Sequence, residues 1–193
     1  MSRFDDAIAR IDAANADDPN TLVIDGVERP KEQAHAELMT RWVTRLDPDA
    51  NEAQLLAARA HHLRRWTRPR RSYPEGRAGY LRWRKQLKEQ HAEEVATVLE
   101  HVGYEPAVVE HVQAIIRKDR AAGRDVQVHE DALCLVFLET QALELASELG
   151  ERKSVDVLRK TLRKMSPEGI ETARALDVDP AVHRLLARAG EPE

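Results

Sequence analysis

Residues 128–149, VHEDALCLVFLETQALELASEL, form the most apolar stretch of the chain and decide its fold class. The centre of this stretch, residues 133–138, is apolar enough to be a buried strand. However, the whole stretch is far longer than the roughly 4–8 residues of a typical strand, and its flanks are rich in the helix-favouring residues Glu, Ala and Leu. We therefore expect the stretch to be helical and buried.

The helical pattern continues on both sides of this stretch. Apolar residues recur every three or four positions, whereas residues 21–24 are typical of one brief strand before a turn. Prolines and glycines predict a loop over 67–76 and a long helix over about 77–102. We predict an all-α fold of about eight or nine helices. They form one domain over residues 1–193, with a core at about 31–149 and C-terminal helices at 152–189 packed on it.

Composition and chain ends exclude several classes of protein. The single cysteine, Cys134, cannot form an internal disulfide, which is typical of a reducing compartment. The N-terminus has no signal-like apolar stretch, and no apolar run approaches the roughly 18–20 residues of a membrane helix. A net charge of -4 gives no whole-molecule case for nucleic-acid or lipid binding. We expect a cytoplasmic protein with no membrane partner.

The adjacent pair His61 and His62 stands out among eight histidines. We expect the pair late in a helix, after small residues that allow close backbone packing. Within ARAHHL at 58–63, the pair resembles the central motif of the HD superfamily. His35, in AHAELM at 34–39, matches the position of the first ligand histidine of that superfamily. Asp131, just before an apolar helix, matches the position of its last ligand aspartate, and His91 lies on the helix that follows the motif.

This resemblance implies an all-helical, HD-domain-like bundle that binds metal and hydrolyses phosphate esters. It implies a metal site built from His35, His61, His62 and Asp131. His91 or Glu130 would move a proton.

The chain departs from the HD motif at His62, where the superfamily has aspartate. Two carboxylates neutralise a divalent ion, whereas three neutral imidazoles and one carboxylate leave the site with a net charge of about one positive unit. We therefore expect one divalent transition metal (Fe, Co, Ni, Zn or Mn) as the cofactor rather than Mg.

The chain is also similar, along nearly its whole length, to an uncharacterised domain-of-unknown-function family of bacteria and fungi. This second resemblance implies no activity. It is carried by DPN at 18–20, RW at 65–66, PR at 69–70, SYP at 72–74, GYLRWR at 79–84, ED at 130–131, CLVFLE at 134–139, RKT at 159–161 and KMS at 164–166.

Residues 64–88, here called the basic segment, hold ten Lys or Arg residues and one acid, Glu75. A solvated helix face is one interpretation, but the prolines and aromatic residues among the arginines favour an anion site. Guanidinium groups grip phosphate at two points, and aromatic rings stack on bases. We expect anion contacts from Arg65, Arg70, Arg77 and Arg84, with secondary roles for Tyr73, Trp83, Lys118, Lys160 and Lys164.

Three functions follow from these patterns and are left open. The first is an HD-like metal-dependent phosphohydrolase that acts on a small phosphorylated molecule or nucleotide. The second is a non-catalytic nucleotide- or RNA-binding module that uses the basic segment. The third is an iron-dependent oxygenase of HD-like fold.

Overall fold

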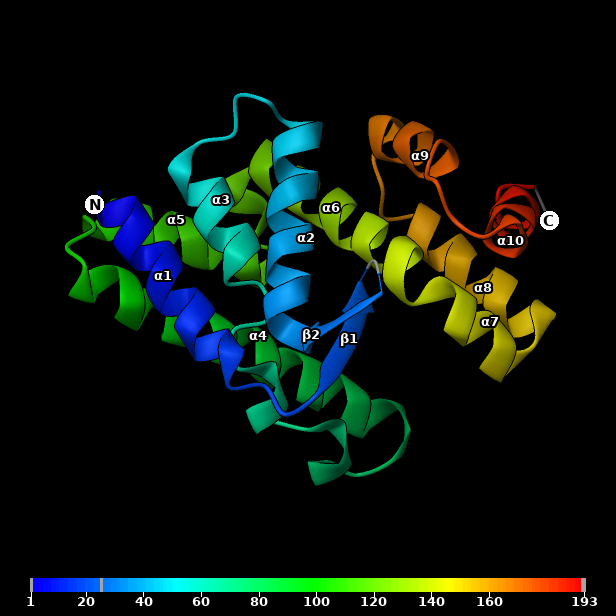
Figure 1. Ribbon diagram of the computed structural model, residues 1–193, viewed down its shortest axis with the longest axis horizontal. Helices are drawn as coiled ribbons and strands as arrows, with labels where there is room; N and C mark the ends of the chain where they lie inside the picture. Colours follow the sequence, from blue (N-terminus) through cyan, green and yellow to red (C-terminus); the bar gives the residue numbers. More distant parts are fainter. Residues whose placement is uncertain (1, 25, 192–193) are drawn as a thin grey trace. The chain divides into compact units, whose positions relative to one another are not determined.

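The computed structural model describes residues 2–24 and 26–191. This part of the chain is predominantly helical with two short strands, which confirms the all-α prediction (Figure 1). No helix within it is both long and apolar enough to cross a membrane. Contacts divide the chain into two compact units, one up to Val126 and one from Gln127 onward. Each unit is described by itself, and the single-domain arrangement stays a prediction.

The first unit contains five long or medium helices, a β-hairpin and three single 3-10 turns among its described residues. In chain order these elements are α1 (Arg3–Ala16), β1 (Thr21–Ile24), β2 (Val27–Pro30), α2 (Lys31–Leu46), α3 (Glu52–Arg59), η1 (Arg65–Thr67), η2 (Arg70–Ser72), α4 (Gly76–His101), α5 (Pro106–Arg117) and η3 (Arg120–Ala122). The boundary between the units falls inside α6 (Arg124–Thr140).

The core of the first unit lies where α5 packs against both α3 and α4. Leu56, Leu99 and Ile115 are fully buried there, one from each helix. Ala57 on α3 and Ala92 on α4 are fully buried in this core, and Ala57 is one of the small residues before the histidine pair. Burial of these apolar side chains is the main source of stability of the unit.

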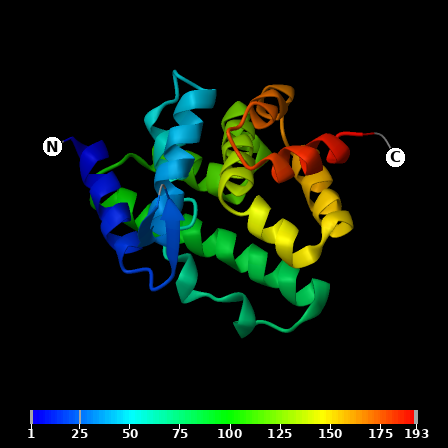
Figure 2. The ribbon, with the colours of Figure 1, turned by 45° about the vertical axis from the view of Figure 1, so that its right-hand side comes forward.

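The β-hairpin positions the start of α2 (Figure 2). Its strands pair antiparallel, so the predicted brief strand is confirmed, and its partner strand is an addition to the prediction. After α1, the carboxylate of Asp18 accepts hydrogen bonds from the backbone N–H groups of Asn20 and Glu32. Asp18 therefore fixes both the entry to the hairpin and the first turn of α2.

The prediction that His61 and His62 lie late in a helix is wrong. Helix α3 ends at Arg59, and the two histidines occupy the turn that follows it. The turn is completed by Arg64, whose φ of 51° is left-handed and whose backbone N–H donates to the side chain of Asn15. Helical periodicity thus ends before the pair because α1 anchors the chain beyond it.

The second unit consists of the remainder of α6, then α7 (Ala142–Leu149), α8 (Glu151–Leu162), α9 (Pro167–Arg174) and α10 (Pro180–Ala189). The apolar stretch at 128–149 is helical as predicted, but Gln141 separates it into α6 and α7. The described chain therefore has more helices than the eight or nine expected. Helix α10 packs on α8 and α7, and side chains of Ser166 and Asp179 cap α9 and α10.

Candidate metal centre and basic pocket

Three histidines from α2 and the turn after α3 meet inside the first unit. His35, His61 and His62 each offer a ring nitrogen, and these atoms all lie within 4.8 Å of one another. The rings of His35 and His62 are stacked, with centroids 4.2 Å apart and planes at 14°. The centroids of His61 and His62 are 4.4 Å apart. The structure therefore brings together the three histidines that the sequence singles out.

Burial favours the neutral form of three imidazoles, those of His35, His62 and His91. Desolvation, followed by the nearby charge of Arg65, lowers the pKa of His35 to about 3. Desolvation also holds the pKa of His62 well below its usual value, and it lowers that of His91 to about 3. The ring of His91 lies 5.8 Å from that of His62, centroid to centroid. Neutral imidazole is the form of histidine that binds metal.

Two ring nitrogens in this group fit a bound ion. His35 Nε2 and His91 Nε2 are buried and have no hydrogen-bond partner among the described residues. A buried polar atom without a partner costs free energy, and metal coordination would remove that cost. The donor set therefore fits a divalent transition metal held by His35, His61 and His62, with His91 beside it.

Glu32 is a member of this cluster that the sequence interpretation missed. Its Oε2 lies 3.0 Å from Nδ1 of His62, and its side chain is only 7% exposed. Burial raises the pKa of Glu32 to about 7, while the guanidinium of Arg65 opposes the shift. Glu32 precedes His35 by three residues and so shares its face of α2, a spacing visible in the sequence.

Asp131, the predicted fourth ligand, is buried in a hydrogen-bond network of the second unit. Its carboxylate accepts hydrogen bonds from the backbone N–H and hydroxyl of Ser166 and from the side-chain amide of Gln127. Ser166 caps α9, so Asp131 supports the start of that helix. The side chain of Glu130, the second predicted proton carrier, lies 4.0 Å from Nζ of Lys164. Metal ligation by Asp131 stays a prediction.

A tight contact between Asp131 and Gly169 predicts a stability effect. A Cβ added at Gly169 would lie 2.6 Å from Cγ of Asp131. Alanine usually stabilises a helix relative to glycine by about 1 kcal/mol. Here we expect Gly169→Ala to lower the free energy of unfolding by about 1–3 kcal/mol because of overpacking.

Urea denaturation of the purified variants measures this effect. Gly190→Ala is the matched control, because its added Cβ meets no atom closer than 3.5 Å. Equal stability of the two variants would contradict the contact between Asp131 and α9.

A polar pocket of about 300 Å³, here called the basic pocket, adjoins the histidines. It contains one acidic side chain, Glu32. Arg65 links the pocket to the metal centre: its Nη1 lies 3.4 Å from Nε2 of His62, and its Nε lies 3.8 Å from Glu32. The lining residues are Pro19, Asn20, Lys31, Glu32, Arg65, Trp66, Arg68, Pro69, Arg70, Arg71 and Trp83.

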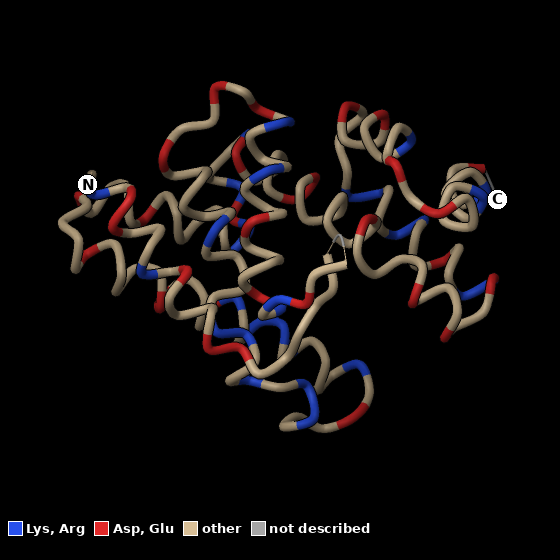
Figure 3. Tube along the Cα trace, in the orientation of Figure 1, with Lys and Arg blue, Asp and Glu red and all other residues tan. Residues whose placement is uncertain are grey.

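The four arginines predicted to bind anions lie in different places. Arg65 and Arg70 line the basic pocket, and Arg70 also donates to the backbone carbonyl of Tyr73. Arg77 is exposed on the first turn of α4. Arg84 lines a separate pocket of about 430 Å³ on α4 and α5, here called the α4 pocket. Figure 3 shows the basic residues of the loop and α4.

The residues given secondary roles are also spread over the structure. Trp83 lines the basic pocket and donates its indole N–H to the backbone carbonyl of Arg68, while the hydroxyl of Tyr73 accepts a hydrogen bond from the guanidinium of Arg68. Lys118 ends α5 in a left-handed conformation. Lys160 is exposed on α8, and Lys164 follows that helix.

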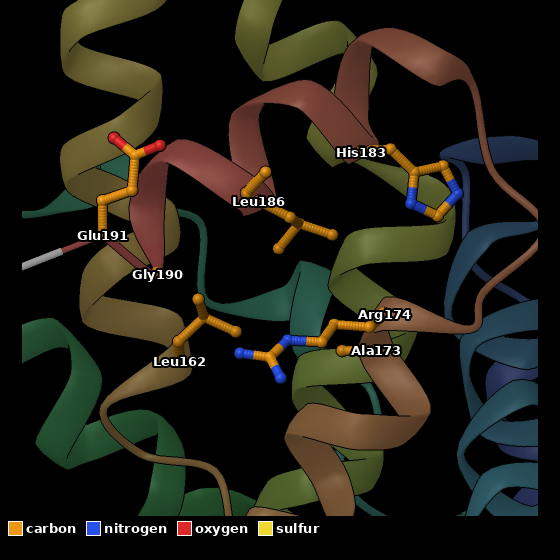
Figure 4. Close-up of a pocket in the computed structure, with 8 residues that line it drawn as sticks. Leu162, Ala173, Arg174, His183, Leu186, Gly190 and Glu191 are labelled. Atoms are coloured by element: carbon orange, nitrogen blue, oxygen red, sulfur yellow. The ribbon is translucent and has the colours of Figure 1, made fainter.

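The second unit has a pocket of its own, of about 450 Å³, that the sequence interpretation did not anticipate (Figure 4). Its wall includes the apolar side chains of Leu162, Ala173 and Leu186, together with Arg174 and His183. These residues come from α8, α9 and α10. The sequence offers little signal for it, because its members are spaced as ordinary amphipathic helix residues.

Comparison with known proteins identifies one similarity. A family model described as "Domain of unknown function (DUF4202)" matches residues 5–186. Neither the curated proteins nor the solved structures gave a match to the chain.

Proposed function

The chain belongs to the family described as a domain of unknown function, DUF4202, and from its side chains we propose that it is a metal-dependent phosphohydrolase. Its substrate would be a small phosphorylated molecule or nucleotide. The observation that carries the proposal is the cluster of His35, His61 and His62, whose ring nitrogens lie within 4.8 Å of one another. The HD-like ligand pattern leads to the same proposal and stays a prediction.

The basic pocket supports a phosphate ester as the substrate. Arg65 lies between the histidines and the pocket, within hydrogen-bonding distance of His62 and stacked on Trp83. Its guanidinium would hold phosphoryl oxygens beside the metal centre and neutralise the charge that gathers on them. When bound, a divalent metal supplies Lewis-acid activation of water and of the phosphoryl group.

Glu32 would hold a proton near neutral pH, whereas His91, whose pKa burial lowers to about 3, would stay neutral. In the metal-free chain, burial raises the pKa of Glu32 to about 7, and a carboxyl with such a pKa can exchange a proton at neutral pH. Glu32 also contacts Nδ1 of His62, as carboxylates beside metal-bound histidines commonly do, and would fix the orientation of that ring.

Elemental analysis together with a hydrolysis assay tests the proposal. We expect the purified native protein to carry about one equivalent of transition metal per chain. It should release phosphate from p-nitrophenyl phosphate or from nucleoside monophosphates, and a chelator should abolish this release. Fully helical protein that takes up no Fe, Co, Ni, Zn or Mn would overturn the proposal. Iron-dependent oxygen consumption without phosphate release would favour the oxygenase instead.

A further inference from the structure

A line of neighbouring cationic and aromatic side chains leaves the basic pocket and runs along α4. The guanidinium of Arg65 lies 5.0 Å from the ring centroid of Trp83. The ring of Trp83 lies 5.9 Å from that of Tyr80, and the guanidinium of Arg84 lies 5.8 Å from the ring of Tyr80. We call these four residues the aromatic track.

The track joins two pockets that are otherwise separate. Its first members line the basic pocket beside the histidines, and Tyr80 and Arg84 line the α4 pocket. Two further basic residues of α4, Lys85 and Lys88, line the α4 pocket as well. The track therefore links the basic residues of the two pockets into one basic surface.

The charges on this surface are available to a ligand. In the described part of the chain, Arg71, Arg77, Arg82, Arg84 and Lys85 form no ion pair with a carboxylate. Tyr80 is 41% exposed and Leu81 is 53% exposed, so apolar surface lies among the charges. An exposed tyrosine ring and a half-buried tryptophan ring beside unpaired cations favour a ligand that carries repeated phosphates and flat bases.

We infer that the aromatic track binds single-stranded nucleic acid, with one end of the strand in the basic pocket beside the histidines. The rings of Trp83 and Tyr80 would stack on bases. The basic side chains of the basic segment would contact the phosphates. Binding along the track requires no metal and does not depend on the proposed function. Hydrolysis of a phosphate at the strand end beside the histidines would rest on the proposed function.

Fluorescence anisotropy with labelled oligonucleotides tests the inference on the native protein. The probes are a single-stranded RNA and a single-stranded DNA of mixed sequence, each about 12 nucleotides long, within the range of known single-strand sites. We expect binding that weakens as salt increases. Tighter binding of RNA or of DNA supports the inference and identifies the source of the strand.

Substitutions on the track sharpen the test. Tyr80→Ala should weaken binding roughly tenfold or more, as loss of a stacking partner does. The double variant Arg84→Gln/Lys85→Gln should weaken binding and reduce the slope of log affinity against log salt by about 1.4, because two phosphate contacts of a single strand are lost. The matched control is Arg152→Gln/Lys153→Gln in the second unit, which makes the same change of net charge and should bind normally.

Two outcomes would overturn the inference. One is binding that the substitutions at 80, 84 and 85 leave unchanged. The other is equal competition by inorganic polyphosphate, which has the charges but no bases. Failure of the phosphohydrolase proposal looks different, because it removes metal content and phosphate release but leaves oligonucleotide binding sensitive to Tyr80→Ala.

Discussion

Replacing His61 with alanine should remove the bound metal and abolish phosphate-ester hydrolysis. His61 is 6% exposed, so water from the solvent cannot readily take the place of its ring nitrogen as a metal ligand. Because the cluster found among residues 2–24 and 26–191 has three histidines, loss of one leaves two imidazoles, too few for the three or four protein ligands typical of transition-metal sites. His35→Ala should behave in the same way. Metal content by elemental analysis and initial rates of phosphate release measure both effects.

Two further variants separate ligation from general damage to the fold. Glu32→Gln keeps the size of the side chain but removes the carboxylate beside His62, and we expect metal affinity to fall by about 10–100-fold, as for outer-shell partners. His101→Ala, at an exposed position at the end of α4, is the matched histidine control and should keep its metal. Normal metal content in His61→Ala would contradict the proposed centre.

The metal-free protein should lose stability steeply between pH 6.5 and pH 4.5. The unfolded chain binds protons on His35, His62 and His91 as pH falls through 6.5, whereas the folded chain keeps these rings neutral because their pKa values are depressed. Stability from these histidines is therefore present above pH 6.5 and is lost as pH falls.

Glu32 acts in the opposite direction. Its folded pKa of about 7 exceeds the usual 4.5, so over the same range the folded chain holds one proton that the unfolded chain lacks. The unfolded state thus binds a net two protons more than the folded state. The free energy of unfolding should fall by about 3 kcal/mol per pH unit, since each proton contributes about 1.4 kcal/mol per unit.

Urea denaturation of chelator-treated protein at several pH values measures this slope. His91→Gln removes one of the three histidines without removing a proposed ligand, and it should reduce the slope by about half. A free energy of unfolding that is flat from pH 7 to pH 5 would show that the imidazoles are not buried in the neutral state.

The sequence predicts the helical fold well because most of its signals are local. Apolar residues repeat every three or four positions, and Ser166 and Asp179 cap the helices that directly follow them. The long helix α4 likewise ends just before a glycine, Gly103. Each of these signals involves residues that are close in the sequence. The end of α3 was predicted too late, because the hydrogen bond that the backbone N–H of Arg64 donates to the side chain of Asn15 joins residues 49 positions apart. No local pattern contains that contact.

The candidate site was predicted only in part, because some of its residues are marked by a local motif and others only by contacts between distant segments. The histidines could be found because the pair is rare and its spacing to His35 resembles a known motif. Glu32 was overlooked because an acidic residue in the first turn of a helix is ordinary, and only its burial against His62 makes it unusual. Ser166 donates hydrogen bonds to Asp131, which lies 35 residues earlier in the chain, and the sequence of neither segment indicates this contact.

The left-handed backbone at Arg64 has a consequence for how this centre can change over evolutionary time. On a helix, neighbouring side chains point about 100° apart, so a site that uses two of them is tied to the rotation of that helix. Here both rings project from the turn that follows α3, and the helix fixes only where this turn begins. Residues of the turn can vary the angle between the rings while the apolar face of α3 stays in register with the core.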